Sequence, residues 1–182
     1  MADMAARAGV TKPVLYRYFG HRSGLYQALA VRYATGLLDE LRMAMAQRPA
    51  GRDTLEEGID AYLRYTEANA HLYRLLATRL PAVDPAGQKL VSGFLTGMAD
   101  EVSRILHESL ETAGIQARTT KLLGYAITGS VQMGAEAWIS ELGRMDRSEA
   151  VANLTDLIWH GLIGALAPRG PGAPEPAEEE IH

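Results

Sequence analysis

The residues best suited to do chemistry lie in a short basic and aromatic run, AGVTKPVLYRYFGHR, at positions 8–22. Lysine and arginine donate to phosphate oxygens and to the O6 and N7 atoms of guanine. A tyrosine can offer its hydroxyl to phosphate or its ring to a thymine methyl. We therefore interpret Lys12, Tyr16 and Arg17 as residues that contact DNA.

Charge is distributed unevenly along the 182-residue chain, whose formal net charge is −4. Residues 1–48 carry seven Lys and Arg against three Asp and Glu, whereas the remainder carries 11 against 19. A basic segment on an acidic body indicates that only the N-terminal part meets a polyanion.

Composition argues against several other classes of protein. The chain has no cysteine, which excludes disulfides, thiolate metal sites and a cysteine nucleophile. Its five histidines show no ligand spacing, and no phosphate-binding glycine loop, H-E-x-x-H pair or G-x-S-x-G elbow occurs. We therefore predict no catalytic residues, no metal and no cofactor, and a helical enzyme is the rival class that these absences disfavour.

The sequence also lacks the signals of a membrane or secreted protein. The longest uncharged apolar run, residues 122–135, is shorter than the roughly 20 residues that a membrane helix needs. The first ten residues have no apolar core like that of a signal peptide. A soluble, cytoplasmic protein with no membrane partner is expected.

The elements that must position the basic run are all predicted to be helices, so the fold class is all-α. Apolar spacing and Gly or Pro breaks place helices at residues 2–8, 12–19, 22–47, 70–78, 86–112, 117–142 and 148–166, with a further helix started by a capping box at 54–57. The chain then divides into an N-terminal part at residues 1–47, a helical body at 48–167 and a disordered tail at 168–182.

Several residues mark the ends of these helices. Gly9 should take the positive φ of a helix C-terminus, Thr11 fits an N-cap, and Pro13 stands in the first turn, where its missing N–H costs little. Asp146 is the predicted N-cap of the last helix. The glycines of segment 117–142 predict close approach by a neighbouring backbone. These glycines are Gly124, Gly129 and Gly134.

Ala5, Gly9 and Leu15 have the spacing of a helix-turn-helix. The motif needs a small residue where two helices meet, a glycine in the turn and an apolar residue that packs the second helix against the first. The stretch MAARAGVTKPVLYRYFGHRSGL, residues 4–25, resembles the DNA-binding segment of TetR-type (TetR/AcrR-like) transcriptional regulators. The usual pattern of that family is Ile-Ala-x-x-Ala-Gly-Val-Ser-x-x-x-Leu-Tyr-x-Tyr/His-Phe-x-x-Lys-x-x-Leu. The resemblance implies a helix-turn-helix domain followed by a helical domain that binds a ligand and dimerises.

The resemblance also implies roles for individual residues of the run. The helix that matches residues 11–19 would enter the major groove of double-stranded operator DNA. The residues that would contact bases or backbone there are Lys12, Pro13, Tyr16 and Arg17. Thr11 and Tyr18 would touch phosphates, and Arg22 would replace the lysine that grips phosphate at the start of the next helix.

The sequence departs from the family pattern in two places. Gly20-His21 and Ser23-Gly24 replace the usual polar cap and acidic first turn, so the start of the third helix is poorly specified. The family also has a helix before the one expected at residues 2–8, and we expect the printed start to be internal to a longer reading frame or truncated. This keeps open an alternative, a headless helical dimerisation and ligand-binding protein without DNA binding.

For the remaining chain, the resemblance implies a small-molecule effector and a homodimer in which the last two helices of each copy form a four-helix bundle. Both helices are apolar on more than one face, which favours a partner. A repressor that releases DNA when the effector binds is the expected mode. Candidate ligand residues are Tyr62, Tyr65, Gln132, Met133, Glu136 and Trp138. Glu136 would favour a cationic or hydrogen-bonding ligand if it faced a cavity.

Overall fold

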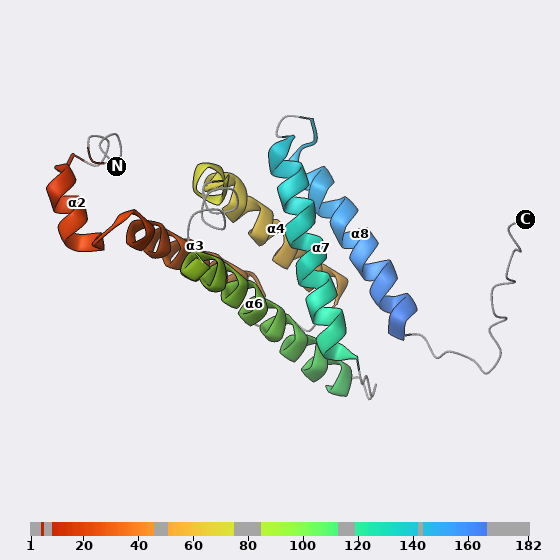
Figure 1. Ribbon diagram of the computed structural model, residues 1–182. Coiled ribbons are helices and arrows are strands. Elements are labelled where there is room, and N and C mark those ends of the chain that lie inside the picture. The colour runs from red at the N-terminus through yellow and green to blue at the C-terminus, as the bar shows by residue number, and fades with distance from the viewer. Residues whose placement is uncertain are drawn as a thin grey trace, which may run out of the picture.

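The computed structural model describes residues 5, 9–45, 51–74, 85–112, 119–141 and 144–166, and every regular element in these ranges is helical (Figure 1). The helices are α2 (Lys12–Phe19), α3 (Arg22–Met45), α4 (Arg52–Ala68), α6 (Pro85–Thr112), α7 (Thr120–Ser140) and α8 (Arg147–Leu166). Residues 70–74 add a short helical segment. The predicted all-α fold class is confirmed. Within the described ranges, no helix is long and apolar enough to cross a membrane.

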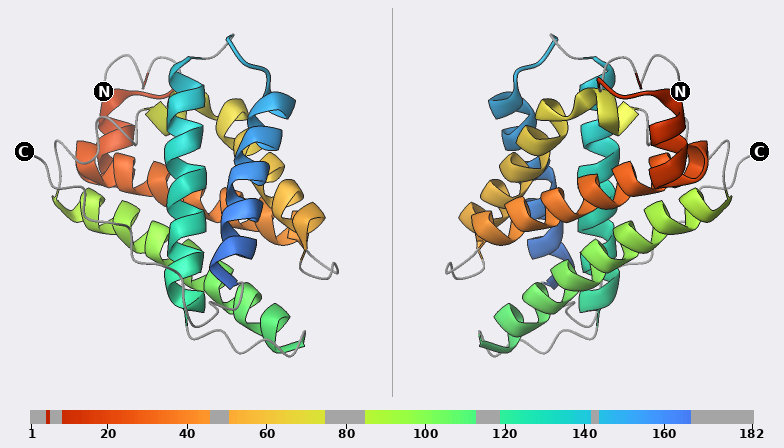
Figure 2. Two further views of the ribbon diagram at one scale, coloured as in Figure 1. Left: turned by 90° about the vertical axis from the view of Figure 1, so that its right-hand side faces the viewer. Right: turned by 90° about the vertical axis from the view of Figure 1, so that its left-hand side faces the viewer.

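The helices are arranged so that α2 projects from one end of the molecule, where it packs against α3 (Figure 1). Helix α4 contacts α3, α7 and α8, and α6 and α7 form the most extensive helix pair. Figure 2 shows α7 and α8 side by side, in agreement with their contacts. One long helix, α3, therefore connects the projecting α2 to the body.

The core lies where α3 and α4 meet the C-terminal helices. Leu37 of α3 and Leu63 of α4 are completely buried, and Ile139 of α7 joins the same cluster. The buried Thr66 hydroxyl donates to the Tyr62 carbonyl oxygen at 2.8 Å. Burial of large apolar side chains along α4 matches the inner stripe that the helical period predicts.

The predicted close approach of a neighbouring backbone is confirmed at Gly124, whereas Gly134 is approached by a side chain. A Cβ built on Gly124 would lie 2.7 Å from the backbone nitrogen of Ser103 in α6, and one on Gly134 would lie 2.6 Å from a methyl carbon of Leu154 in α8. Nothing lies within 4 Å of the corresponding position at Gly129, so the prediction of close approach within the chain is wrong there. Gly129 faces outward from this pair of contacts.

The start of α8 agrees with its predicted N-cap, whereas the start of α4 does not agree with its predicted capping box. Asp146 is confirmed as the N-cap of α8, because its Oδ1 accepts from the Glu149 N–H at 2.8 Å. Hydrogen bonds to the Asp146 carboxylate hold its pKa below the usual value, and the bond from the Glu149 N–H is the main cause. The capping box at 54–57 is wrong: α4 begins at Arg52 after Gly51, and Thr54 is buried inside the first turn. The Leu55 N–H donates to the Gly51 carbonyl at 3.1 Å, so the first turn of α4 begins before the predicted capping box.

Other boundaries differ by a few residues or lie outside the described residues. Helix α7 begins at Thr120, later than the predicted residue 117. The predicted helix at 2–8, apart from Ala5, and the tail at 168–182 lie outside the described residues, as does the domain boundary at 47/48.

Candidate DNA interface and ligand cavity

Helix α2 has the turn geometry that its sequence predicts. Gly9 and Gly20 both adopt positive φ, of 65° and 69°, a conformation that favours glycine. Thr11 stands at the N-cap position in extended conformation, although its side chain makes no capping bond. Pro13 lies in the first turn as predicted. The Gly20 N–H donates to the Tyr16 carbonyl at 2.8 Å and ends the helix. A glycine with positive φ therefore precedes and follows this two-turn helix.

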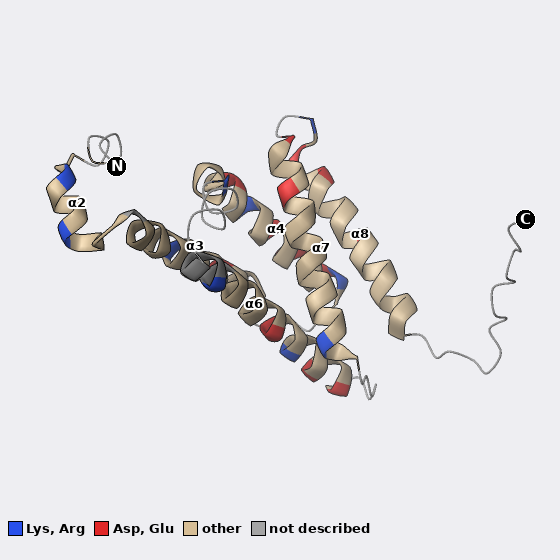
Figure 3. Ribbon diagram, in the orientation of Figure 1, with Lys and Arg blue, Asp and Glu red and all other residues tan. Residues whose placement is uncertain are grey.

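The side chains predicted to contact DNA gather on the exposed part of α2. Leu15 is the buried residue that anchors the helix to the protein. Lys12 Nζ lies 5.9 Å from the centre of the Tyr16 ring, and the Arg17 guanidinium lies 5.7 Å from that of Tyr18. The exposed members of the predicted set are Thr11, Lys12, Pro13, Tyr16, Arg17 and Tyr18. Figure 3 shows the basic residues on this projecting helix, which contains no acidic residue.

Arg22, the remaining residue of the predicted set, is the first residue of α3, and its side chain lies outside the described residues. Its phosphate contact stays a prediction.

A residue that sequence reasoning missed, His21, holds the junction between α2 and α3. Its Nδ1 accepts from the Gly24 backbone N–H at 3.1 Å and lies 2.6 Å from the Ser23 hydroxyl. These contacts place the imidazole where Ser, Thr, Asp or Asn usually caps a helix, so α3 has a polar cap after all. Histidine is not among the preferred N-cap residues, so the sequence pattern does not predict this cap.

Replacing His21 with alanine is expected to destabilise the protein by about 1 kcal/mol, because the Gly24 N–H loses its acceptor. His21→Asn should recover most of this loss, since asparagine is among the best N-cap residues. Urea unfolding monitored by circular dichroism measures both free energies. Equal losses in the two variants would contradict a capping role.

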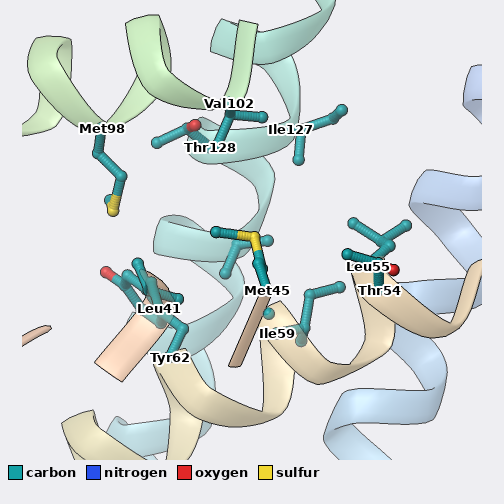
Figure 4. Close-up of a pocket in the computed structure, with 12 residues that line it drawn as sticks. Leu41, Met45, Thr54, Leu55, Ile59, Tyr62, Met98, Val102, Ile127 and Thr128 are labelled. Atoms are coloured by element: carbon teal, nitrogen blue, oxygen red, sulfur yellow. The ribbon is translucent and has the colours of Figure 1, made fainter. Parts of the chain in front are cut away.

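An apolar cavity of about 90 Å³, the central cavity, lies between α3, α4, α6 and α7 (Figure 4). Its walls are formed by Leu41, Met45, Thr54, Leu55, Gly58, Ile59, Tyr62, Met98, Val102, Ile127, Thr128 and Val131. Among the described atoms, the buried Thr128 Oγ1 has no hydrogen-bond partner. A mostly aliphatic cavity of this kind suits an apolar ligand better than a charged one.

A second cavity of about 230 Å³, the distal cavity, adjoins the central one toward the C-terminal ends of α6 and α8. It is lined by Met45, Gly51, Thr54, Leu55, Val102, Ile105, Leu106, Ser109, Leu110, Ile127, Trp159, Leu162, Ile163 and Leu166. Its walls include the exposed Ile163, whereas no residue of the central cavity is exposed. The distal cavity is therefore the one closer to the surface.

Of the predicted ligand residues, Tyr62 alone lines either cavity. Tyr65 packs edge-on against Tyr33 with ring centres 5.2 Å apart, and Trp138 donates its Nε1 proton to the Met145 carbonyl at 3.0 Å. The residues that line neither cavity are Tyr65, Gln132, Met133, Glu136 and Trp138. Their ligand roles stay predictions. Glu136 is exposed, which removes the argument for a cationic ligand.

Burial keeps the tyrosines next to the central cavity neutral. It raises the pKa of Tyr62 well above the usual value, with smaller contributions from Tyr73, Tyr33 and Glu136. It also raises the pKa of Tyr73 to about 12, again with help from the Glu136 carboxylate. The Tyr62 phenol is therefore a neutral hydrogen-bonding group at physiological pH. Within the described residues, no cluster of three or more His, Asp or Glu could hold a metal ion.

The outer surface of α7 and α8 carries a stripe of apolar and small residues, which we call the α7/α8 face. Its members are Leu122, Ala126, Gly129 and Met133 on α7 and Leu157, Gly161 and Gly164 on α8. Leu122, Met133 and Leu157 are each more than 60% exposed. A hollow of about 320 Å³ between the two helices is lined partly by Ala126, Leu157 and Gly161. This surface has the composition of an interface.

Comparison with known proteins gives matches over most of the chain. Among curated proteins, it is 25% identical over 162 residues to the HTH-type transcriptional activator FasR of Mycolicibacterium smegmatis, covering 89% of this chain and 73% of FasR. It is 28% identical over 171 residues to an uncharacterized HTH-type transcriptional regulator of Mycobacterium tuberculosis H37Rv, covering 93% and 71% of the two chains.

Among solved structures, the fold is similar to that of the transcriptional regulator FadR from Bacillus subtilis in complex with stearoyl-CoA. The TM-score is 0.77 at 16% identity, with 88% of this chain and 87% of FadR covered. Residues 1–29 match the family of bacterial regulatory proteins named after tetR, and residues 40–173 match the tetracyclin repressor-like C-terminal domain. With both of its characteristic parts recognised, the chain belongs to the TetR family of transcriptional regulators.

Proposed function

We propose that this TetR-family protein is a ligand-responsive DNA-binding regulator that acts as a homodimer and releases operator DNA when an apolar small molecule fills its cavity. The observation that carries the proposal is the path of α3. This helix begins next to the exposed α2 and ends at Met45, and both Leu41 and Met45 lie in the cavity wall. A ligand that moves the end of α3 therefore acts on the element that holds α2.

The DNA contact is assigned to the exposed face of α2. Lys12 and Arg17 supply charge for phosphates and guanine edges, and Tyr16 can reach phosphate or a thymine methyl. Helix α2 has no acidic residue that would pair with Lys12 or Arg17 in place of DNA. The supporting positions assigned to bases or phosphates are Thr11, Pro13, Tyr18 and Arg22. A regulator of this kind works beside the chromosome, in the cytoplasm.

The partner assigned to the α7/α8 face is a second copy of the chain. A two-fold pairing would place two copies of each helix together as a four-helix bundle, with the open glycines Gly129, Gly161 and Gly164 allowing close approach. A dimer of this form presents two α2 helices to successive major grooves, about 34 to 36 Å apart.

The ligand class assigned to the cavity is an apolar molecule with an aliphatic chain. Its walls offer Tyr62, Thr54 and Thr128 as the polar side chains among aliphatic neighbours. The stearoyl-CoA complex of FadR supports this assignment, because it shows that a similar fold accommodates a long acyl group. We assign the repressor mode, in which ligand binding lowers DNA affinity. The FasR relative is named as an activator, so a ligand that raises DNA affinity would reverse this part of the proposal.

The test begins with a selection of bound duplexes from random DNA, followed by affinity measurements on the selected site. Lys12→Ala and Arg17→Ala are each expected to weaken binding about 10- to 100-fold, the value of one base-edge contact. Lys121→Ala is the matched control, because Lys121 also lies over a tyrosine ring, at 5.7 Å, but on α7. It should leave affinity unchanged.

Two results would contradict the DNA assignment. Recovery of no duplex above background would favour the headless alternative, and equal losses in Lys121→Ala and Lys12→Ala would show that α2 is not the contact. Fluorescence anisotropy with and without palmitate or palmitoyl-CoA then tests the sign of the ligand response.

A further inference from the structure

We propose that Met45 is the residue that sets ligand length, by separating the distal from the central cavity until a long chain displaces it. This inference rests on the proposed ligand-binding function. It assigns to one side chain both the discrimination between short and long ligands and the contact through which a long ligand reaches α3.

The two cavities meet at a ring of shared residues. Five residues line both of them, and they come from four helices: Met45, Thr54, Leu55, Val102 and Ile127. Met45 is the member contributed by α3. Figure 4 shows its side chain reaching into the space between Ile59 of α4 and Val102 of α6. A ligand that occupies both cavities must pass this ring.

Among the ring residues, Met45 is the one that can most readily move. Thr54, Val102 and Ile127 are β-branched and therefore restricted at χ1. Methionine is unbranched, with three rotatable bonds and a polarizable sulfur that adapts to different surroundings. Gly58 presents no side chain to it, since a Cβ built there would only reach van der Waals contact, 3.4 Å from Met45 Sδ, and the two cavities that Met45 borders supply the space into which it can turn. The side chain therefore has both the freedom and the space to change rotamer.

The consequence is a dependence on chain length. A short apolar ligand fits the distal cavity of about 230 Å³ and leaves Met45 in place. A longer chain extends into the central cavity of about 90 Å³ and must push the Met45 side chain aside. Because Met45 stands at the C-terminal end of α3, only the longer ligand acts directly on the helix that carries α2.

Calorimetric titration of the full chain with octanoate, laurate, palmitate and stearate tests the inference. Met45→Ala opens the ring, so palmitate and stearate should bind on the order of tenfold more tightly than to wild type, because they no longer displace a packed side chain. Octanoate affinity should change less than about twofold. Met43→Ala is the control, because Met43 lies on the same helix but is 71% exposed and lines neither cavity.

A second variant keeps the test decisive if Met45→Ala does not fold, which circular dichroism would reveal. Met45→Leu conserves volume but is stiffer, so it should weaken palmitate and stearate binding about fivefold while sparing octanoate. A uniform change across all four acids, or none in either variant, would overturn the role of Met45 and leave the cavity assignment intact. Failure of wild type to bind any of the acids would instead refute the acyl ligand and the proposed function of the cavity.

Discussion

Replacing Gly124 with alanine is expected to lower the free energy of unfolding by about 3 kcal/mol. The added Cβ would lie 2.7 Å from the Ser103 backbone nitrogen and 2.8 Å from its Cα, distances that real Cβ atoms do not adopt. Backbone atoms cannot rotate away, so α6 and α7 must separate, and they form the most extensive helix pair of the fold. Chemical unfolding monitored by circular dichroism measures the loss.

The matched control is Gly97→Ala on α6. Gly97 is exposed, and nothing lies within 4 Å of a Cβ built on it. There the greater helix propensity of alanine should stabilise the protein by up to about 1 kcal/mol, the opposite sign. If both alanines stabilise the fold, the close contact between α6 and α7 is not present in solution.

Replacing Leu157 with glutamate is expected to convert the homodimer that we propose into a monomer. Leu157 is 68% exposed within one chain and lines the hollow on the α7/α8 face. In a two-fold dimer the substitution places two carboxylates in an apolar interface, and each unpaired buried charge costs several kcal/mol. Sedimentation velocity measures the change in mass, and operator affinity should fall with it because two α2 helices no longer bind together.

Met43→Glu is the control for the dimer, since it adds the same charge at a similarly exposed position on α3, away from the α7/α8 face. It should remain dimeric. A Leu157→Glu protein that keeps the mass of a dimer would place the interface elsewhere.

Much of the DNA-binding end could be predicted from sequence because its signals are local. The bounds of α2, Lys12–Phe19, agree with the predicted segment, and Gly9 and Gly20 take the positive φ that marks the ends of helices. Exposure of the basic and aromatic residues follows from one buried leucine, Leu15, on a short helix. The cap of α3 could not be predicted from N-cap preferences, because His21 accepts through a ring nitrogen and those preferences are for the side-chain oxygens of Ser, Thr, Asp and Asn.

The ligand cavity could not be predicted in the same way, because it is built from segments far apart in the chain. Its shared ring combines residues of α3, α4, α6 and α7. Polar or aromatic residues on apolar helices indicate Tyr62 but not Met45, because an aliphatic cavity wall has the same composition as a core stripe. Tyr65 and Trp138 show the reverse case, in which aromatic residues serve packing contacts outside both cavities.

Local sequence is enough to predict the all-α class, the turn and helix that carry Lys12 and Arg17, and the family pattern, because each depends on neighbours within a few residues. Which apolar side chains line a cavity and which pack in the core depends on contacts between distant segments. Helical period assigns a residue to a face, but only the packing of four helices shows whether that face meets another side chain or a cavity. Met45 is an apolar residue of this kind, and the packing of the four helices places it in the wall of both cavities.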